Sequence, residues 1–359
     1  MLTGWCYRLA AGPPSRVTLV PIETFFLVAA YALFWCLSQR LFGRAYAGAL
    51  TLMFALGQNS YTALESTNDG FDTNETYMLV PMLAAVYAHL AVIPPVRRGL
   101  LRGLGIGCAL LVKQSAAVLC GALIVHVLFE AVIHRRYRPA MVDLAMTVSG
   151  VFLAVMPVLV LLGARGWLSL HLADLRDLSG LHVGGFTLGV PPGYVLLPLL
   201  PAAWWVLVGG LSNPQGRFDA APTLSVSWRS ACVLVVAWFG TEAVTLATLI
   251  KPATHYYQLL VIPAVLTAGF GITRITRSLD VQQSAGMRVR RWVGVTTAVL
   301  LLIAAMPVIG AAVRHGRSFD RTEDERVFSA WLAAWPAYGT ADALRKTVQT
   351  GRTTSSGQP

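Results

Sequence analysis

The chain has 359 residues, of which 55% are hydrophobic and 13% are charged, and its mean hydropathy is +0.61. A soluble domain carries roughly 25% charged residues, so this composition excludes an ordinary water-soluble domain and indicates that lipid is the solvent. The net charge of +11 does not indicate a nucleic-acid-binding protein, because the basic residues gather in alternate loops between apolar segments.

Ten apolar segments follow one another along the chain, most of them near the ~20 residues that cross a bilayer. The pattern predicts an all-α fold, a polytopic bundle of about ten transmembrane helices. The short fourth and fifth segments could form a hairpin that does not fully cross. The segments are Val17–Leu37, Ala45–Ala63, Thr76–Val92, Gly99–Val112, Ser115–Ile133, Val142–Leu162, Tyr194–Leu211, Ala231–Ile250, Tyr257–Ile272 and Val293–Val313.

The loops between these segments fall into two alternating sets, and one set is much richer in basic residues. The positive-inside rule places the richer set in the cytoplasm, which identifies a multi-pass protein of the cytoplasmic membrane. The N-terminus and the C-terminal tail are then outside. The basic residues of the richer set are Arg40 and Arg44; Arg97, Arg98 and Arg102; Arg135, Arg136 and Arg138; Arg217 and Arg229; and Arg274, Arg277, Arg288, Arg290 and Arg291.

This orientation divides the chain into three predicted parts. Residues 1–16 form an outer N-terminal segment, residues 17–313 the transmembrane domain, and residues 314–359 an outer tail that is partly disordered. Residues 1–16 contain neither a signal peptide nor a preceding span. An N-terminus outside is possible for so short a segment, and the pattern also fits a chain that has lost a first span and the outer loop after it.

An outer loop contains four carboxylates and no basic residue: Glu65, Asp69, Asp72 and Glu75. Carboxylate oxygens suit Mg²⁺ or Mn²⁺, and one carboxylate could act as a general base. A solvated loop between two helices explains the cluster equally well. Glu75 begins the next helix, where a carboxylate faces the positive end of the helix dipole. We take Glu75, Asp72 and Glu65 as candidate catalytic acids, and Glu75 with Asp69 as candidate metal ligands.

Two other outer segments could bind an anionic group such as a lipid phosphate. Lys113 and Gln114 lie between two apolar segments, and Lys251, His255 and Tyr256 lie between two more. Alternatively, both lysines could snorkel to the headgroups, with the tyrosines forming an aromatic belt. Three glycines precede Lys113 and would let helices approach closely: Gly103, Gly105 and Gly107.

Several ionisable residues fall within predicted spans, and five of them are considered for function or depth. Glu242 is near the middle of its segment, and a carboxylate inside a membrane is a functional candidate by default. The other four, His89, His126, Glu130 and Asp143, are closer to the cytoplasmic ends of their segments. We expect these four to lie at the membrane interface.

Four local patterns together resemble the polytopic glycosyltransferases of the C-type fold, the superfamily that includes the aminoarabinose transferases and the protein O-mannosyltransferases. Their order and spacing along roughly residues 17–275 also agree with that superfamily, and the combination is more specific than any one pattern. The patterns are Arg40–Arg44, Thr73–Pro81, Gly103–Ser115 and Lys251–Pro263.

The resemblance implies an enzyme that takes a sugar from a polyprenyl-phosphate donor at the outer face, with that donor and the membrane lipid as partners. It implies that Glu75 binds a metal or positions the substrate, and that Lys113, Lys251 and His255 hold the lipid phosphate. A cation or a divalent metal, Mg²⁺ or Mn²⁺, would then stabilise the phosphate that leaves.

The resemblance begins at the second span of the family, whose principal catalytic acid lies in the first outer loop. Residues 1–16 contain no Asp or Glu, so that acid has no counterpart here. Two other functions therefore stay open. One is a transporter or flippase of a lipid-linked or small anionic substrate, which would use Glu242 and the intramembrane histidines. The other is a non-catalytic, truncated homologue.

Overall fold

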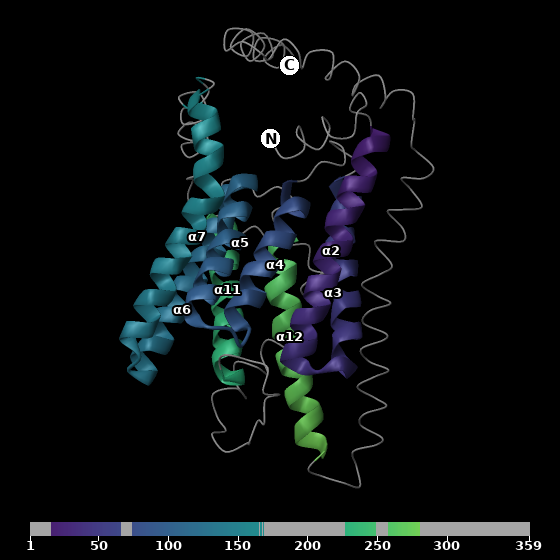
Figure 1. Ribbon diagram of the computed structural model, residues 1–359. Coiled ribbons are helices and arrows are strands. Elements are labelled where there is room, and N and C mark those ends of the chain that lie inside the picture. The colour runs from purple at the N-terminus through teal and green to yellow at the C-terminus, as the bar shows by residue number, and fades with distance from the viewer. Residues whose placement is uncertain are drawn as a thin grey trace. The chain divides into compact units, whose positions relative to one another are not determined.

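The computed structural model describes residues 16–65, 74–164, 227–248 and 258–280, with the single positions 166 and 168. These residues are almost entirely helical and include no strand (Figure 1). The all-α prediction is confirmed for this part of the chain. The predicted spans Tyr194–Leu211 and Val293–Val313 lie outside it, so the total of ten helices stays a prediction.

Eight α-helices and one 3-10 helix make up the described residues, and three of them are long and apolar enough to cross a membrane. The three candidate spans are Thr24–Phe42, Ala117–His134 and Tyr137–Ala164. The helices are α2 (Arg16–Phe42), α3 (Arg44–Glu65), α4 (Asn74–Leu90), α5 (Pro95–Val112), η1 (Gln114–Ala116), α6 (Ala117–His134), α7 (Tyr137–Ala164), α11 (Trp228–Thr248) and α12 (Gln258–Asp280).

The chain divides into two compact units. One unit consists of Met1–Phe25, Pro157–Leu181 and Ser318–Pro359, and the other of Phe26–Met156 and His182–Arg317. In the first unit the described residues are chiefly the start of α2 and the end of α7. The packing and polar contacts of the bundle belong to the second unit.

Short turns join several of the helices. Gly43 separates α2 from α3 with a φ of 88°, a left-handed conformation that glycine adopts without strain. Pro95 opens α5, where a proline costs no helical hydrogen bond. Only Arg135 and Arg136 separate α6 from α7, and Arg135 is left-handed with a φ of 52°. Such short connections make consecutive helices run in opposite directions.

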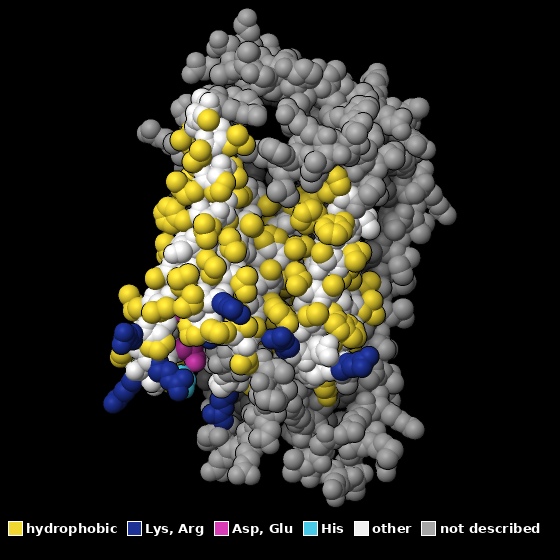
Figure 2. All heavy atoms as spheres, in the orientation of Figure 1, with side chains coloured by type: hydrophobic (Ala, Val, Ile, Leu, Met, Phe, Trp, Pro, Cys, Tyr) yellow, Lys and Arg dark blue, Asp and Glu magenta, His cyan; other side chains and the backbone are white. Residues whose placement is uncertain are grey.

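These turns meet at one end of the bundle. The guanidinium carbon of Arg40 lies 4.4 Å from the ring centre of Tyr87, which joins the ends of α2 and α4. Glu130, one turn before the end of α6, accepts a hydrogen bond from the hydroxyl of Ser230 at the start of α11. We call this the basic end, and Figure 2 shows Lys and Arg side chains gathered toward one end of an apolar face. Its arginines are Arg40, Arg44, Arg97, Arg98, Arg102, Arg135, Arg136, Arg138 and Arg229.

The position of these arginines at one end agrees with the alternation of basic-rich and basic-poor loops in the sequence. It supports the predicted helix directions for α2 to α7 and for α11. The side of the membrane on which the basic end lies is still the prediction of the positive-inside rule.

Helix α5 lies between α4 and α7 and uses glycine against both. A Cβ on Gly103 would lie 3.0 Å from the Cα of Gly150 in α7, and one on Gly105 would lie 2.8 Å from the carbonyl oxygen of Pro81 in α4. Gly107 also faces α7. Because the opposing atoms of the first two are backbone, they could not move aside for a larger side chain. The predicted role of these glycines in close helix approach is confirmed.

The predicted hairpin of the fourth and fifth segments is not confirmed, because the two helices follow each other through η1 but pack on different partners. Helix α5 packs chiefly on α4, and α6 packs chiefly on α11 and only lightly on α5. Helix α6 is also long and apolar enough to cross a membrane alone. The glycines explain the difference, because they give α5 flat surfaces that fit α4 and α7 better than the bulky face of α6.

Candidate functional site

The first group of candidate residues belongs to the end of the bundle opposite the basic end, where α3 ends and α4, α6 and α12 begin. Glu65 is the last residue of α3 and Glu75 the second of α4, and the structure describes the backbone of both. The remaining candidates of the acidic loop and of the segment before α12 lie outside the described residues. They are Asp69, Asp72, Lys251, His255 and Tyr256.

Lys113 and Gln114 lie at this same end. Lys113 caps the C-terminus of α5, with its backbone N–H 2.9 Å from the carbonyl oxygen of Ala109. Gln114 opens η1, and the hydroxyl of the next residue, Ser115, lies 4.0 Å from the sulfur of Met78 in α4. The Lys113–Gln114 turn is therefore beside the first turns of α4.

The ends of α3 and α12 also meet here. The side-chain amide of Gln58 donates a hydrogen bond of 2.9 Å to the carbonyl oxygen of Gln258, the first residue of α12. The structure thus brings together the helix ends that flank the predicted site. Convergence of the Glu75, Lys113 and His255 side chains on one cavity stays a prediction.

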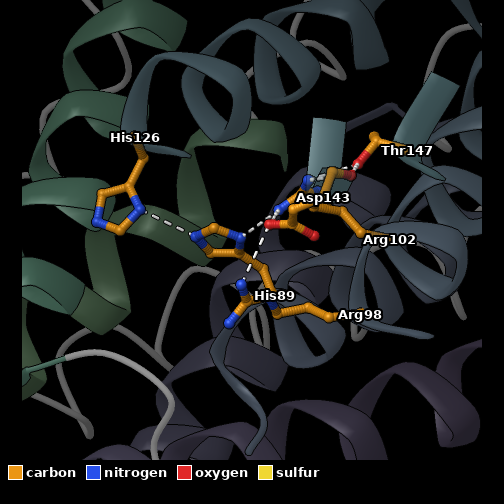
Figure 3. Close-up of polar contacts among 6 residues, drawn as sticks. All are labelled: His89, Arg98, Arg102, His126, Asp143 and Thr147. Carbon is orange, nitrogen blue, oxygen red and sulfur yellow. Dashed lines mark hydrogen bonds and ion pairs between the residues drawn. The ribbon is translucent and has the colours of Figure 1, made fainter. Parts of the chain in front are cut away.

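A second group of polar side chains lies inside the bundle near the basic end (Figure 3). Arg102 of α5 is 0% exposed, with its Nη1 2.8 Å from Nδ1 of His89 in α4. The same Nη1 lies 3.2 Å from Oδ2 of Asp143 in α7. His89 and Asp143 are buried as well. Their predicted depth at the membrane interface stays a prediction, whereas the assignment of Arg102 to a loop is wrong, because Arg102 lies within α5.

Asp143 receives two guanidinium groups. Nη2 of Arg98 lies 3.3 Å from Oδ2 of Asp143, beside the Arg102 contact. Arg102 also donates to the hydroxyl of Thr147, one turn after Asp143. Both arginines stand on one face of α5 because they are four residues apart. Gly99 between them faces Asp143 directly, which lets α7 approach.

The contacts continue through a pair of histidines. Nε2 of His89 lies 2.9 Å from Nδ1 of His126 in α6. Nε2 of His126 lies 3.0 Å from the carbonyl oxygen of Ser230 and 2.8 Å from its hydroxyl. The Ser230 hydroxyl donates to the carboxylate of Glu130, whose other oxygen lies 3.3 Å from His134. The contacts form one chain through α5, α4, α6 and α11, which we call the histidine chain.

The spacing of polar residues in the sequence is a signal for part of the histidine chain. Arg98 and Arg102 are spaced by four residues, as are Asp143 and Thr147, so each pair presents polar groups on one face of a helix. His126 was expected at the interface and is only 3% exposed. Position along a segment gives depth in the membrane, whereas burial depends on which neighbours cover that face.

Glu242 is a buried carboxylate of α11, and the indole N–H of Trp238 donates to it at 3.2 Å. Its predicted place inside a helix is confirmed. Among the residues that the structure describes, no three His, Cys, Asp or Glu side chains are grouped closely enough to hold a metal ion.

No protein-family model, curated protein or solved structure that was compared with this chain matches it. The resemblance to the C-type glycosyltransferases therefore depends on the four sequence patterns alone.

Proposed function

We propose that the protein is a membrane glycosyltransferase that moves a sugar from a polyprenyl-phosphate donor to an acceptor hydroxyl. The observation that carries the proposal is the contact between Ser115 and Met78. It joins the turn that holds Lys113 to the start of α4, one turn after Glu75. A cation and a carboxylate on neighbouring helix ends suit a reaction in which a phosphate leaves and a hydroxyl attacks.

In the proposed reaction the bond between the sugar C1 and the phosphate oxygen breaks, and a bond from C1 to the acceptor oxygen forms. The acceptor proton passes to a carboxylate of the acidic loop, with Glu75 first and Asp72 and Glu65 as the other candidates. The polyprenyl phosphate leaves with its charge balanced by Lys113, Lys251 and His255. Gln114 and Tyr256 would orient the donor by hydrogen bonding.

A divalent ion fits the proposal, because Glu75 and Asp69 offer the oxygen ligands that Mg²⁺ and Mn²⁺ prefer. When bound, such an ion would neutralise charge on the leaving phosphate. Titration of Mg²⁺ and Mn²⁺ into the metal-stripped protein, followed by binding of a non-hydrolysable donor analogue, tests this part separately from turnover.

The central test is transfer from a radiolabelled polyprenyl-phosphate sugar in lipid nanodiscs. Replacing Glu75 with Gln removes the proton acceptor, so transfer should fall by about 10²- to 10⁴-fold. His134→Gln is the control, because this side chain is 52% exposed at the basic end. Undiminished transfer by the Glu75 variant would remove Glu75 from the mechanism, and absence of transfer by the native chain would overturn the proposal.

A transporter or flippase is the second candidate, and the burial of Glu242 favours it. Polar side chains in a membrane interior often mark a substrate or ion path. The two candidates differ in what Glu242→Gln should do. A transporter predicts loss of substrate movement across the membrane, whereas a transferase predicts that sugar transfer continues in any correctly folded Glu242 variant.

A further inference from the structure

The bonds of the histidine chain fix which nitrogens of its two imidazoles carry protons. Arg102 has only donors, so Nδ1 of His89, 2.8 Å away, must accept. A neutral His89 then carries its proton on Nε2 and donates to Nδ1 of His126 at 2.9 Å. His126 in turn carries its proton on Nε2, where the carbonyl oxygen of Ser230 accepts at 3.0 Å.

Every bond in the chain therefore runs in one direction, from the Arg102 cation to the Glu130 carboxylate. The Ser230 hydroxyl completes it by donating to Glu130. In this arrangement each of the two imidazoles uses one donor and one acceptor, and both rings are neutral.

A further proton on either ring breaks the chain. On His89 it would occupy Nδ1 and face the N–H of Arg102, which does not lose its proton in proteins. On His126 it would occupy Nδ1 and face the N–H of His89. In either case two N–H groups would point at each other across 2.8 or 2.9 Å.

The groups around the histidine pair differ on its two sides. From α5, Arg102 and Arg98 act on His89, and from α7 the carboxylate of Asp143 partly offsets them. The Cys120 thiol of α6 also lies near Arg102. On the other side Glu130 of α6 acts on His126, and Ser230 of α11 adds no charge.

The Glu130 side is also the accessible side of the chain. The side chain of Glu130 is 22% exposed, and His134 beside it is 52% exposed. A proton from the basic end therefore approaches the pair from the side of Glu130, and its place on His126 is Nδ1, because Nε2 already carries a proton. It goes no further than the pair, because Arg102 cannot release a proton at the other end. The histidine chain can therefore take up a proton but cannot conduct protons across the membrane.

The histidine chain joins two pairs of helices that share one apolar core but bring few backbone positions close together. Helix α4 packs closely on α5, and α6 packs on α11, whereas the packing of α6 on α4 and α5 is slight. The bond between His89 and His126 crosses from the first pair of helices to the second. Its loss would leave the two pairs held by apolar contacts and by η1, without a polar contact between the histidines.

We propose that the histidine chain is an acid-sensitive latch near the basic end of the bundle, closed when His89 and His126 are both neutral and opened when the pair takes up a proton. Opening loosens α6 and α11 from α4 and α5. The proposal needs no glycosyltransferase activity, so it stands or fails independently of the proposed function.

The test measures the distance between two spin labels, one just after α4 and one in α11, on opposite sides of the histidine chain. Labels at Val92→Cys, just after α4, and Val233→Cys, one turn after Ser230, use exposed positions. The five native cysteines are replaced by alanine, and the full chain is held in nanodiscs at about pH 7.5 and about pH 4. The lower value lies well below the range of free imidazole, because burial beside arginines opposes a charge on the pair. We expect the distance distribution to shift to longer values and broaden at the lower pH.

Two variants separate the latch from general effects of acid. His89→Gln with His126→Gln removes the titrating pair and should abolish the pH-dependent shift. His134→Gln removes a histidine that is exposed and outside the pair, so the shift should persist. If the double variant does not fold, His89→Gln and His126→Gln are measured singly, and each should reduce the pH-dependent shift. A distribution that does not change with pH in the labelled native chain, or a shift that survives loss of the pair, would overturn the proposal.

Discussion

Helices α5 and α7 lie side by side, and the more apolar helix, α7, is the less buried of the two. Helix α7 is the most apolar of the three candidate spans, yet only 11% of the residues in its most apolar stretch are buried. Helix α5 carries Arg97, Arg98 and Arg102 and is not among those spans, yet it packs between α4 and α7. Along these two helices, the apolar side chains of α7 are largely exposed, whereas glycine and charged residues form the contact between α5 and α7.

The physical reason is that lipid removes the hydrophobic advantage of burying an apolar side chain. Helices in a bilayer associate through close packing of small residues and through polar contacts. Gly103 and Gly150 supply the close packing, and Arg102 with Asp143 supplies the polar contact. The exposed face of α7, with Phe152 and Leu153, needs no protein partner.

The largest effect is expected from Asp143→Ala. This change leaves the fully buried Arg102 without its carboxylate, and removing one partner of a buried pair costs about 3–5 kcal/mol. Thermal unfolding in nanodiscs, followed by tryptophan fluorescence, measures the loss. The double variant Arg102→Leu with Asp143→Ala should be less unstable than the single variant, because Arg98 is partly exposed and reaches water. Equal instability of the two variants would contradict an unpaired charge as the cause.

A charge on the exposed face of α7 should have the next largest effect. Leu153 is 60% exposed near the middle of α7, so Leu153→Arg would place a cation in the hydrocarbon region. The cost at the centre of a span is about 2.5–3.5 kcal/mol. The measurement is the fraction of α7 that inserts in a glycosylation-based insertion assay. Leu153→Ala is the control and should insert normally, whereas normal insertion of the arginine variant would mean that this face does not contact lipid.

A smaller effect is expected from adding a methyl group where α5 meets α7. Gly103→Ala would force backbone apart and should destabilise the bundle by about 1–3 kcal/mol. Gly121→Ala in α6 is the matched control, since nothing lies within 4 Å of its added Cβ. That change should be neutral or stabilising by up to about 1 kcal/mol. Thermal unfolding of both variants under one condition makes the comparison, and similar losses in both would argue against the close packing.

The smallest expected effect is spectroscopic and needs no change in stability. The chain has seven histidines, and at neutral pH two of them should be neutral rings protonated at Nε2. Selective ¹⁵N labelling of histidine and solid-state NMR in lipid measure the tautomers. His89→Gln and His126→Gln assign the two signals, and a proton on Nδ1 of either assigned ring would contradict the direction of the chain.

The sequence predicted the helices well because hydropathy and basic loops report directly on lipid and on its two faces. It placed α4, α6 and α7 within a few residues of their observed bounds. It also predicted close packing through Gly103 and Gly105. These features depend on local composition, which a single sequence displays.

Contacts between distant segments were beyond the sequence. Nothing local indicates that Asp143 meets Arg102, forty-one residues earlier, or that His126 meets Ser230. Whether a polar residue near the end of a span faces lipid, water or protein is decided by which helices surround it. For the same reason the sequence could propose Glu75 and Lys113 as partners but could not derive the contact of Ser115 with Met78 beside them.

The two-residue turn between α6 and α7 also bears on how the protein is made. Two apolar helices of 18 and 28 residues are joined only by Arg135 and Arg136, and Arg135 takes the left-handed conformation that reverses the chain. No loop is long enough for the first helix to be threaded and released before the second emerges. We expect the pair to enter the bilayer together as a preformed helical hairpin, with the arginine turn held back on the side where synthesis takes place.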